Sequence, residues 1–386
     1  MIQKKSVINE KRILIEGWRG INHSYALVNQ YQLIWLSKLT SQLYHHDVQY
    51  INGAWDKEVN SNGFDPKMNS IIANISACNG QSRPPDITYR IASPLKSCEF
   101  NSELKYVFGT SELQTLEGKG SDEDIKILIQ NENETIVTPS SWSAIGFSNA
   151  GISEERIKVI PHGIEPSIFY PEENGLVNQC RKKLGIGESD FVILSLGAMT
   201  ENKGIDILLL AYAILKKKYH HIRLILKDQS NLYGSGPTNE LRSFITKNPK
   251  VFSQFVRSGI ILISDNLSTD MLRTLYSSVQ CYASPYRAEG FNMTPLEAAA
   301  CGVPIIITDG GSTEEYAHKS FAIKISSTAK SINNQHYLEP DLDCLIEKLS
   351  NLIEGKSNQL SKKIALSRIK ELHSWEHVTK MLYNIL

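Results

Sequence analysis

Residues 284–316 constrain the fold more than any other stretch, because they combine a loop, a helix start and a strand in a recognisable order. The apolar residues 279–284 predict a strand that leads into this stretch, and the run 303–308 predicts a second strand buried on both faces. Between the two strands, Thr294 as N-cap, the proline after it and Glu297 in a capping box predict the first turn of a helix. Strands that alternate with helices indicate an α/β fold with parallel sheets.

Two carboxylates in this stretch are candidates for ligand binding. Glu289 and Glu297 lie eight positions apart, the first in the loop and the second in the helix. Ligands of open α/β sheets bind at the carboxyl ends of the strands, and a helix N-terminus there attracts phosphate. Gly290 would let the backbone approach a ligand, and Glu297 could accept hydrogen bonds from ribose hydroxyls. An alternative interpretation is that Glu297 serves only the capping box, which needs no ligand.

The order E-G-F-x-x-x-P-L-E-A-x-A-C-G-x-P, which begins at Glu289, resembles the Glu-x7-Glu signature of retaining glycosyltransferases of group 1, the family 4 type. The resemblance implies an α/β fold of the GT-B kind, in which two Rossmann-like domains face a central cleft. It also implies that Glu289 lies at the transferred sugar and that Glu297 binds the ribose of the donor nucleotide. Further donor-binding residues implied by the resemblance are Gly290, Phe291, Asn292, Met293 and Thr294.

The resemblance also predicts the domain boundaries. The segment P-H-G-I-E at 161–165 is similar to the passage between the two domains of this family. We therefore expect an acceptor domain at residues 1–163 and a nucleotide-sugar donor domain at residues 164–373. The closing S-W-E segment resembles the family's last helix, so residues 374–386 are expected to pack back on the first domain.

The first loop of the chain follows an apolar strand at residues 12–16. In the resembled family this loop faces the donor phosphate and the acceptor, and it often carries two adjacent glycines. This chain has Arg19-Gly20, so the donor-binding role falls on Gly20, and Arg19 becomes a candidate on the acceptor side. We interpret His23 as a histidine that starts the next helix rather than as a catalyst.

A second acceptor-side candidate follows the strand predicted at residues 104–108. Many members of the family have a histidine there that touches the transferred sugar, and this chain has none. Glu112 is the candidate replacement on the acceptor side. The alternative is that Glu112 only starts a helix.

Two lysines are candidates for binding the donor diphosphate. The loop after the strand at 191–196 resembles the family's G-R-x-x-x-x-K-G, in which arginine and lysine bind the diphosphate. Lys203 matches the lysine, but Ala198 stands at the arginine position, which removes a charge-assisted contact. Lys227 ends the neighbouring strand, and parallel strands direct their carboxyl ends to one crevice. Our hypothesis is that Lys227 compensates for the missing arginine; the alternative is a solvated strand end.

Composition excludes several partner classes. The 386 residues hold 41 Lys+Arg and 41 Asp+Glu, so no overall basic charge favours nucleic acid. No apolar run approaches the roughly 18 residues of a transmembrane helix, and the N-terminus lacks the apolar segment of a signal peptide. The six scattered cysteines indicate free thiols in a reducing compartment. We expect a cytoplasmic protein, either free or peripheral at a membrane.

Two segments fit metal-binding patterns, but neither is expected to hold a metal. Residues 373–377 fit H-x-x-E-H, but Ser374 is the expected helix N-cap, so the two histidines would not share a helix face. Asp341 and Asp343 fit D-x-D but fall at a late helix start, as on a solvated face. We therefore predict no metal and no cofactor beyond the donor co-substrate.

The predicted function is transfer of a sugar from a nucleotide-diphospho-sugar to an acceptor hydroxyl, with retention of configuration. Glu289 and Lys203 are the predicted catalytic residues, since one would orient the sugar and the other would stabilise the leaving diphosphate. The acceptor, whether a glycan, a lipid-linked molecule or a protein, is not specified by the sequence. Two alternatives remain: a nucleotide-sugar epimerase or hydrolase of the same fold, and a non-catalytic nucleotide-sugar-binding protein.

Overall fold

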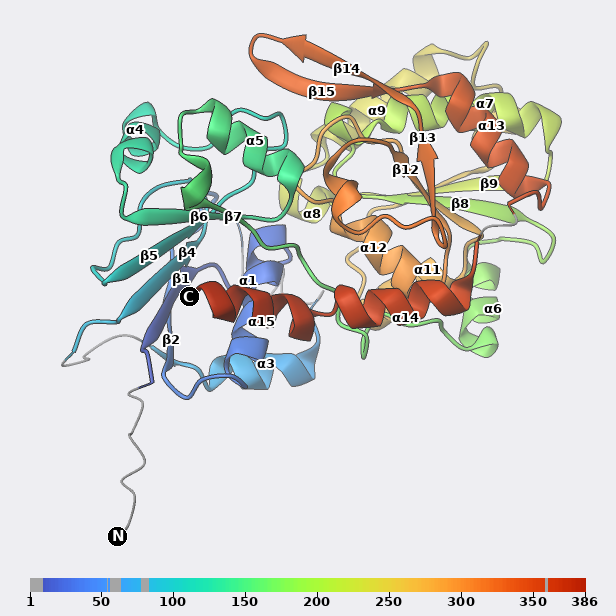
Figure 1. Cartoon of the computed structure of the whole chain (residues 1–386). Helices are drawn as coiled ribbons and strands as arrows, with labels where there is room; N and C mark the ends of the chain where they lie inside the picture. The colour runs from blue at the N-terminus through green and yellow to red at the C-terminus, as the bar shows by residue number, and fades with distance from the viewer. Residues whose placement is uncertain (1–9, 54, 56–63, 78–82, 358–359) are drawn as a thin grey trace.

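The computed structural model describes residues 10–53, 55, 64–77, 83–357 and 360–386. It has two α/β lobes, each built on a parallel sheet (Figure 1). The first sheet has seven strands in the order β3-β2-β1-β4-β5-β6-β7, and the second has six in the order β10-β9-β8-β11-β12-β13. Within the described residues, this arrangement confirms the predicted α/β fold of the GT-B kind with two Rossmann-like domains.

The elements of the first lobe follow the alternation of apolar strands and capped helices. The strands are β1 (Ile13–Gly17), β2 (Leu43–Asp47), β3 (Ser76–Ala77), β4 (Ile87–Ile91), β5 (Leu104–Phe108), β6 (Glu134–Thr138) and β7 (Ile157–Val159). The helices are α1 (Ser24–Leu36), α3 (Pro66–Ala73), α4 (Asp122–Gln130), α5 (Ser141–Asn149) and the short η2 (Glu154–Arg156).

The second lobe has the same alternation of strands and helices around its own sheet. Its strands are β8 (Phe191–Leu196), β9 (Ile222–Lys227), β10 (Ile260–Ile263), β11 (Cys281–Ser284), β12 (Ile305–Thr308) and β13 (Ala322–Ile325). Its helices are α6 (Asn174–Lys183), η3 (Glu201–Lys203), α7 (Ile205–Lys218), α8 (Ser230–Tyr233), α9 (Gly236–Lys247), α10 (Gln254–Arg257), α11 (Thr269–Ser277), α12 (Met293–Ala300), η4 (Ser312–Glu315) and α13 (Leu342–Ile353).

The two last helices, α14 (Lys362–Leu372) and α15 (Trp375–Ile385), follow one another in a line from the second lobe across to the first (Figure 1). Helix α15 packs on α1, where the rings of Tyr31 and Trp375 stack with their centroids 5.2 Å apart. The segment that passes from the first lobe to the second is hydrogen-bonded to the start of α15. The amide of Ile164 donates to the carbonyl of His373, and the carbonyl of Ile164 accepts from the amide of Trp375. A Cβ on Gly163 would lie 2.7 Å from the Trp375 backbone, so a glycine is needed at this close approach.

Two elements of local structure are not evident from the sequence. Strand β2 lies at Leu43–Asp47, where the polar sequence LYHHD gives no clear strand pattern, and residues 48–51 form no strand. Strand β13, which ends at Ile325, is not the last strand. It is followed by an antiparallel hairpin of β14 (Ser327–Ile332) and β15 (Gln335–Pro340), whose turn has Asn333 and Asn334 at φ 50° and 62°. Asparagine tolerates this left-handed conformation, which is why a short hairpin forms there.

Five cysteines are free thiols, namely Cys98, Cys180, Cys281, Cys301 and Cys344. Cys78 lies outside the described residues.

Candidate active site

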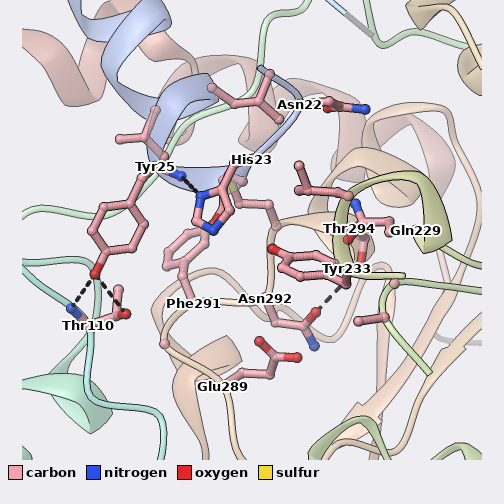
Figure 2. Close-up of a pocket in the computed structure, with 18 of the residues that line it drawn as sticks. Asn22, His23, Tyr25, Thr110, Gln229, Tyr233, Glu289, Phe291, Asn292 and Thr294 are labelled. Atoms are coloured by element: carbon pink, nitrogen blue, oxygen red, sulfur yellow. Dashed lines mark hydrogen bonds between the residues drawn. The ribbon is translucent and has the colours of Figure 1, made fainter. Parts of the chain in front are cut away.

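A cavity of about 670 Å³ lies between the two lobes, and both lobes contribute side chains to its wall (Figure 2). The first lobe contributes residues from the start of α1 and from the loop after β5. The second lobe contributes the loops after β8, β9 and β11 and the start of α12. These loops follow the carboxyl ends of parallel strands, the position at which open α/β sheets bind ligands.

Helix α12 begins earlier than the sequence suggested. Asn292 is the N-cap, in the left-handed conformation with φ 65°, and Thr294 lies within the first turn. The prediction that Thr294 is the N-cap was therefore wrong. The side-chain amide of Asn292 donates to Ser284 Oγ at 2.9 Å, and the backbone carbonyl of Asn292 accepts from the hydroxyl of Tyr316 at 2.7 Å, so the helix start is held on both sides. No side chain caps the helix, which leaves its first N–H groups available at the cavity.

Glu297 lines the cavity and has a different partner from the one a capping box requires. Its Oε2 atom accepts a hydrogen bond of 2.7 Å from the hydroxyl of Tyr276. Because the N-cap is Asn292, the capping-box interpretation of Glu297 no longer holds. Burial raises the pKa of Glu297 to about 7, while the hydrogen bond from Tyr276 opposes the shift. A buried carboxyl in a cleft that titrates near neutral pH is typical of a functional site.

Glu289 and Lys203 meet on the cavity wall. The Nζ atom of Lys203 forms an ion pair with Oε1 of Glu289, and both side chains line the cavity. Glu289 is 8% exposed, and burial raises its pKa although Lys203 opposes the shift. Lys203 is positioned by Gly204, which has φ 65° and lies so close to the Pro285 carbonyl that a Cβ would meet it at 1.9 Å.

Gly290 and Phe291 join the cavity loop to the first lobe. A Cβ on Gly290 would lie 2.9 Å from the Cβ of Thr110, so the glycine makes room for the opposite lobe. The Gly290 carbonyl accepts a 2.6 Å hydrogen bond from Ser140 at the start of α5. Phe291 packs on His162, with ring centroids 4.9 Å apart. These contacts bring the two lobes together at the loop that carries Glu289.

Lys227 also lines the cavity, on the strand next to β8. Its ammonium group donates to the carbonyl of Asp228, and burial lowers its pKa. The side chain is 6% exposed, so it is not a solvated strand end. Ala198, at the position of the family's arginine, lies in the same wall.

The acceptor-side candidates differ in their placement. Glu112 lines the cavity in a turn, not at a helix start, and forms an ion pair with Lys119, which lines it too. That pairing keeps the pKa of Glu112 below its ordinary value although burial acts in the other direction. Arg19, the other acceptor-side candidate, and Gly20, a predicted donor-binding residue, are not among the residues of the cavity wall. Arg19 pairs with Asp47 at 2.8 Å, and the Gly20 amide donates to a glutamine side chain.

The residues of the wall that the sequence did not indicate include His23, Lys119 and Tyr233. His23 is the N-cap of α1, in agreement with its interpretation as a helix-start residue. Lys119 lies in a loop without a motif, and Tyr233 lies at the end of the four-residue helix α8. Neither of these two has a signal in the sequence that could have identified it.

Comparison with known proteins shows what the second lobe's side of the cavity is similar to. Residues 177–335 match the family model "Glycosyl transferases group 1". This part of the chain is therefore similar to glycosyltransferases of group 1. The matched region contains Lys203, Lys227, Glu289 and Glu297, and so covers the second lobe's side of the cavity.

The curated proteins similar to this chain include glycosyltransferases and synthases of sugar conjugates. The chain is 28% identical over 179 residues to alpha-galactosylglucosyldiacylglycerol synthase of Streptococcus pneumoniae, which covers 46% of this chain and 45% of that protein. It is 24% identical over 185 residues to mannosylfructose-phosphate synthase of Agrobacterium fabrum, or 48% of this chain and 39% of that protein. The chain thus spans less than half the length of these relatives.

Solved structures extend the likeness to the whole fold. HepE from Anabaena, determined in complex with UDP and glucose, aligns with a TM-score of 0.68 at 14% identity over 97% of this chain and 99% of that chain. WaaG, a glycosyltransferase involved in lipopolysaccharide biosynthesis, aligns with a TM-score of 0.64 at 14% identity over 97% and 99%. At these identities the likeness shows the GT-B fold alone.

Two further observations concern the predicted absences. Across the described residues, no group of three or more His, Cys, Asp or Glu side chains is placed to hold a metal ion. The helices of the described chain include none that is long and apolar enough to cross a membrane. Independence from a metal stays a prediction.

Proposed function

We propose that this protein transfers a sugar from a nucleotide-diphospho-sugar to an acceptor hydroxyl, with retention of configuration and without a metal. The observation that carries the proposal is the composition of the cavity wall: Lys203, Glu289 and Glu297 lie around the uncapped start of α12. The glycosyltransferase relatives support the class of reaction, and the complex of HepE with UDP-glucose makes UDP-sugars the first donors to test.

The donor diphosphate would lie at the start of α12. The first N–H groups of that helix, together with the ammonium groups of Lys203 and Lys227, would stabilise the negative charge that develops as the diphosphate leaves. The resembled arginine is absent at Ala198, so the buried Lys227 supplies the second positive charge in this proposal. Glu297 would accept hydrogen bonds from the ribose hydroxyls.

The sugar would lie between the lobes, next to Glu289. This carboxylate would orient the sugar or stabilise positive charge at the anomeric carbon, while the leaving phosphate takes the proton of the acceptor hydroxyl. The acceptor would enter on the side of Glu112 and Lys119, in the first lobe. Contact between the lobes at Gly290 and Thr110 would exclude water during transfer, which protects the donor from hydrolysis.

The first experiment measures thermal stability with UDP, GDP and ADP and then with their sugar conjugates, since a ligand that binds the folded state raises the melting temperature. The stabilising donor is then incubated with candidate acceptors in the presence of EDTA, and products are assigned by NMR. A glycoside with the donor's anomeric configuration supports the proposal. Free sugar or an epimer as the only product would instead identify a hydrolase or epimerase, and binding without turnover would identify a non-catalytic protein.

A further inference from the structure

The imidazole of His23 occupies the first lobe's side of the cavity, at the start of α1. Figure 2 shows the ring on the same cavity as Glu289, Asn292 and Tyr233. The loop after β5 contributes Thr110 and Glu112 to the wall but no histidine. Of the cavity's described residues, His23 and His162 are the two histidines, and the His162 ring packs against Phe108 and Phe291. His23 differs in lying at the start of α1.

The hydrogen bond at the other ring nitrogen fixes the tautomer. The backbone N–H of Tyr25 donates to Nδ1 of His23 at 3.1 Å, so Nδ1 has no proton. In a neutral imidazole the proton must then lie on Nε2. No hydrogen bond to Nε2 is present within the described part of the chain. The ring thus offers an N–H donor to the cavity. Protonation at Nδ1 would break the hydrogen bond from the Tyr25 amide, by which His23 caps α1.

The surroundings keep the ring neutral and fix its orientation. Burial lowers the pKa of His23 to about 4, although Glu112 opposes the shift, so the ring is uncharged at neutral pH. The positive end of the α1 dipole acts in the same direction. The ring lies edge-on to Trp18 at 5.1 Å between centroids, 5.3 Å from Trp55 and 6.0 Å from Tyr233 of the opposite lobe.

From this arrangement we propose that His23 binds the transferred sugar, by donating its Nε2–H to a hydroxyl oxygen of that sugar. The inference rests on the proposed function, since it assigns a contact to the sugar of the nucleotide-sugar donor. A neutral, oriented N–H donor suits a neutral hydroxyl. It is not a general base, because Nε2 already carries its proton and Nδ1 is engaged by the backbone.

Two substitutions separate this role from helix capping. In His23→Asn the side-chain oxygen can accept from the Tyr25 amide, as asparagine does at N-caps, but the donor at the Nε2 position is lost. In His23→Gln the longer amide can place its NH2 group near the Nε2 position, but the cap is weakened. A purely structural histidine would tolerate the first change and suffer from the second.

The experiment measures, for both variants and wild type, the melting temperature, the affinities for UDP and UDP-glucose by calorimetry, and kcat and KM for transfer. A different nucleotide pair replaces UDP if the ligand screen selects one. We expect His23→Asn to keep the melting temperature and UDP affinity of wild type, while affinity for the nucleotide sugar falls about 3- to 10-fold, the range of one neutral hydrogen bond. We expect His23→Gln to retain more of the nucleotide-sugar affinity with a lower melting temperature.

The outcomes separate this inference from the proposed function. If wild type binds and transfers a nucleotide sugar, and His23→Asn does so with unchanged constants, the inference is overturned and the function stands. If both variants lose UDP and nucleotide-sugar affinity in parallel with stability, His23 acts only through the packing of its surroundings, and the inference is again overturned. A wild-type protein that binds no nucleotide sugar would overturn the proposed function, and the assignment of His23 with it.

Discussion

Lys203 and Glu289, the two residues proposed to act on the donor, form an ion pair with each other on the cavity wall. A diphosphate that binds Lys203 must therefore compete with a carboxylate for the same ammonium group. Burial, which raises the pKa of Glu289, makes its charge costly once Lys203 turns to the diphosphate. Donor binding would thus release Glu289 toward the sugar at the time that its negative charge is needed.

The first prediction concerns Glu289→Gln. The neutral amide no longer holds Lys203 by charge, so the affinity for a nucleoside diphosphate should increase. Transfer should fall by about 100-fold, the usual cost of removing one group that stabilises charge in a transition state. Calorimetry with the diphosphate and initial rates with the complete donor measure the two effects. Lys203→Met is the matched variant and should lose both; weaker diphosphate binding by Glu289→Gln would contradict the model of competition.

The second prediction concerns Glu297 and pH. Its pKa is raised by burial from 4.5 to about 7, so the stability contributed by the neutral carboxyl is fully present below about 4.5 and is lost as the pH rises through about 7. Glu297→Gln, which cannot ionise, should therefore gain stability relative to wild type as the pH rises from about 4.5 to 7. Chemical denaturation at pH 5, 6, 7 and 8 measures the difference, and a constant difference would contradict the raised pKa.

The same titration should govern donor binding. Ribose hydroxyls donate to a carboxylate more strongly than to a neutral carboxyl, because charge-assisted hydrogen bonds are stronger. Nucleotide affinity of the wild type should therefore increase between pH 6 and 8, and this increase should disappear in Glu297→Gln. An equal pH dependence in both proteins would remove Glu297 from the ribose site.

The third prediction concerns Lys227, which lies in the cavity wall at 6% exposure. Lys227→Met keeps the apolar stem of the side chain and removes one charge-assisted contact, so the affinity for a nucleoside diphosphate should fall by about 10-fold or more, while that for the nucleoside changes little. Lys217→Met, on the exposed side of α7, is the matched control. Unchanged diphosphate affinity in Lys227→Met would mean that another group replaces the arginine missing at Ala198.

Much of the second lobe could be predicted from the sequence, because its local signals agree with its tertiary structure. Strand β8 was predicted with the observed boundaries and β9 with its observed end at Lys227, since each is a largely apolar run. The motif that begins at Glu289 also indicated a site at this edge of the sheet. The start of α12 was misplaced, because Asn292 adopts a left-handed conformation and the cap has no side-chain hydrogen bond to mark it.

The first lobe's side of the cavity was less predictable. Its residues come from separate loops, and their contacts with the second lobe arise only from the tertiary arrangement. Gly290 illustrates the difference: its place in the motif suggested approach to a ligand, whereas the structure places Thr110 of the opposite lobe against it. Arg19 was predicted on the acceptor side because it lies in the first loop of the chain. In the structure it pairs with Asp47 and is not in the cavity wall.

The fourth prediction tests the contact between the lobes at Ser140. This side chain caps α5 by accepting from Ser143, and it donates to the Gly290 carbonyl of the other lobe at 2.6 Å. Ser140→Ala should cost about 1 kcal/mol for the lost cap and should also lower kcat/KM, since the loop of Glu289 loses its tie to the first lobe. Ser121→Ala removes a similar cap, at the start of α4, without a contact to the second lobe in the described structure. It should therefore lose stability but keep kcat/KM; equal kcat/KM losses would contradict a special role for Ser140.

The fifth prediction concerns Arg287, which ties the hairpin to the loop of Glu289. Its guanidinium binds Glu339 of β15 at 2.9 and 3.0 Å and both oxygens of Asp206 at 2.9 Å. The other end of the hairpin reaches the first lobe, where the amide of His336 donates to the carbonyl of Leu113, next to Glu112. The hairpin therefore joins the loops on the two sides of the cavity.

Arg287→Lys keeps the charge but loses the planar fork that binds two carboxylates at once. The loop of Glu289 should then be held less firmly, and because small misplacements of reacting groups are costly, kcat should fall by about 10-fold with little change in nucleoside diphosphate affinity. Arg257→Lys, on the exposed side of α10, is the matched control and should leave kcat unchanged. Initial rates and calorimetry distinguish the two effects. A loss of diphosphate affinity equal to the loss in kcat would show that Arg287 supports the second lobe as a whole and does not act on the position of Glu289.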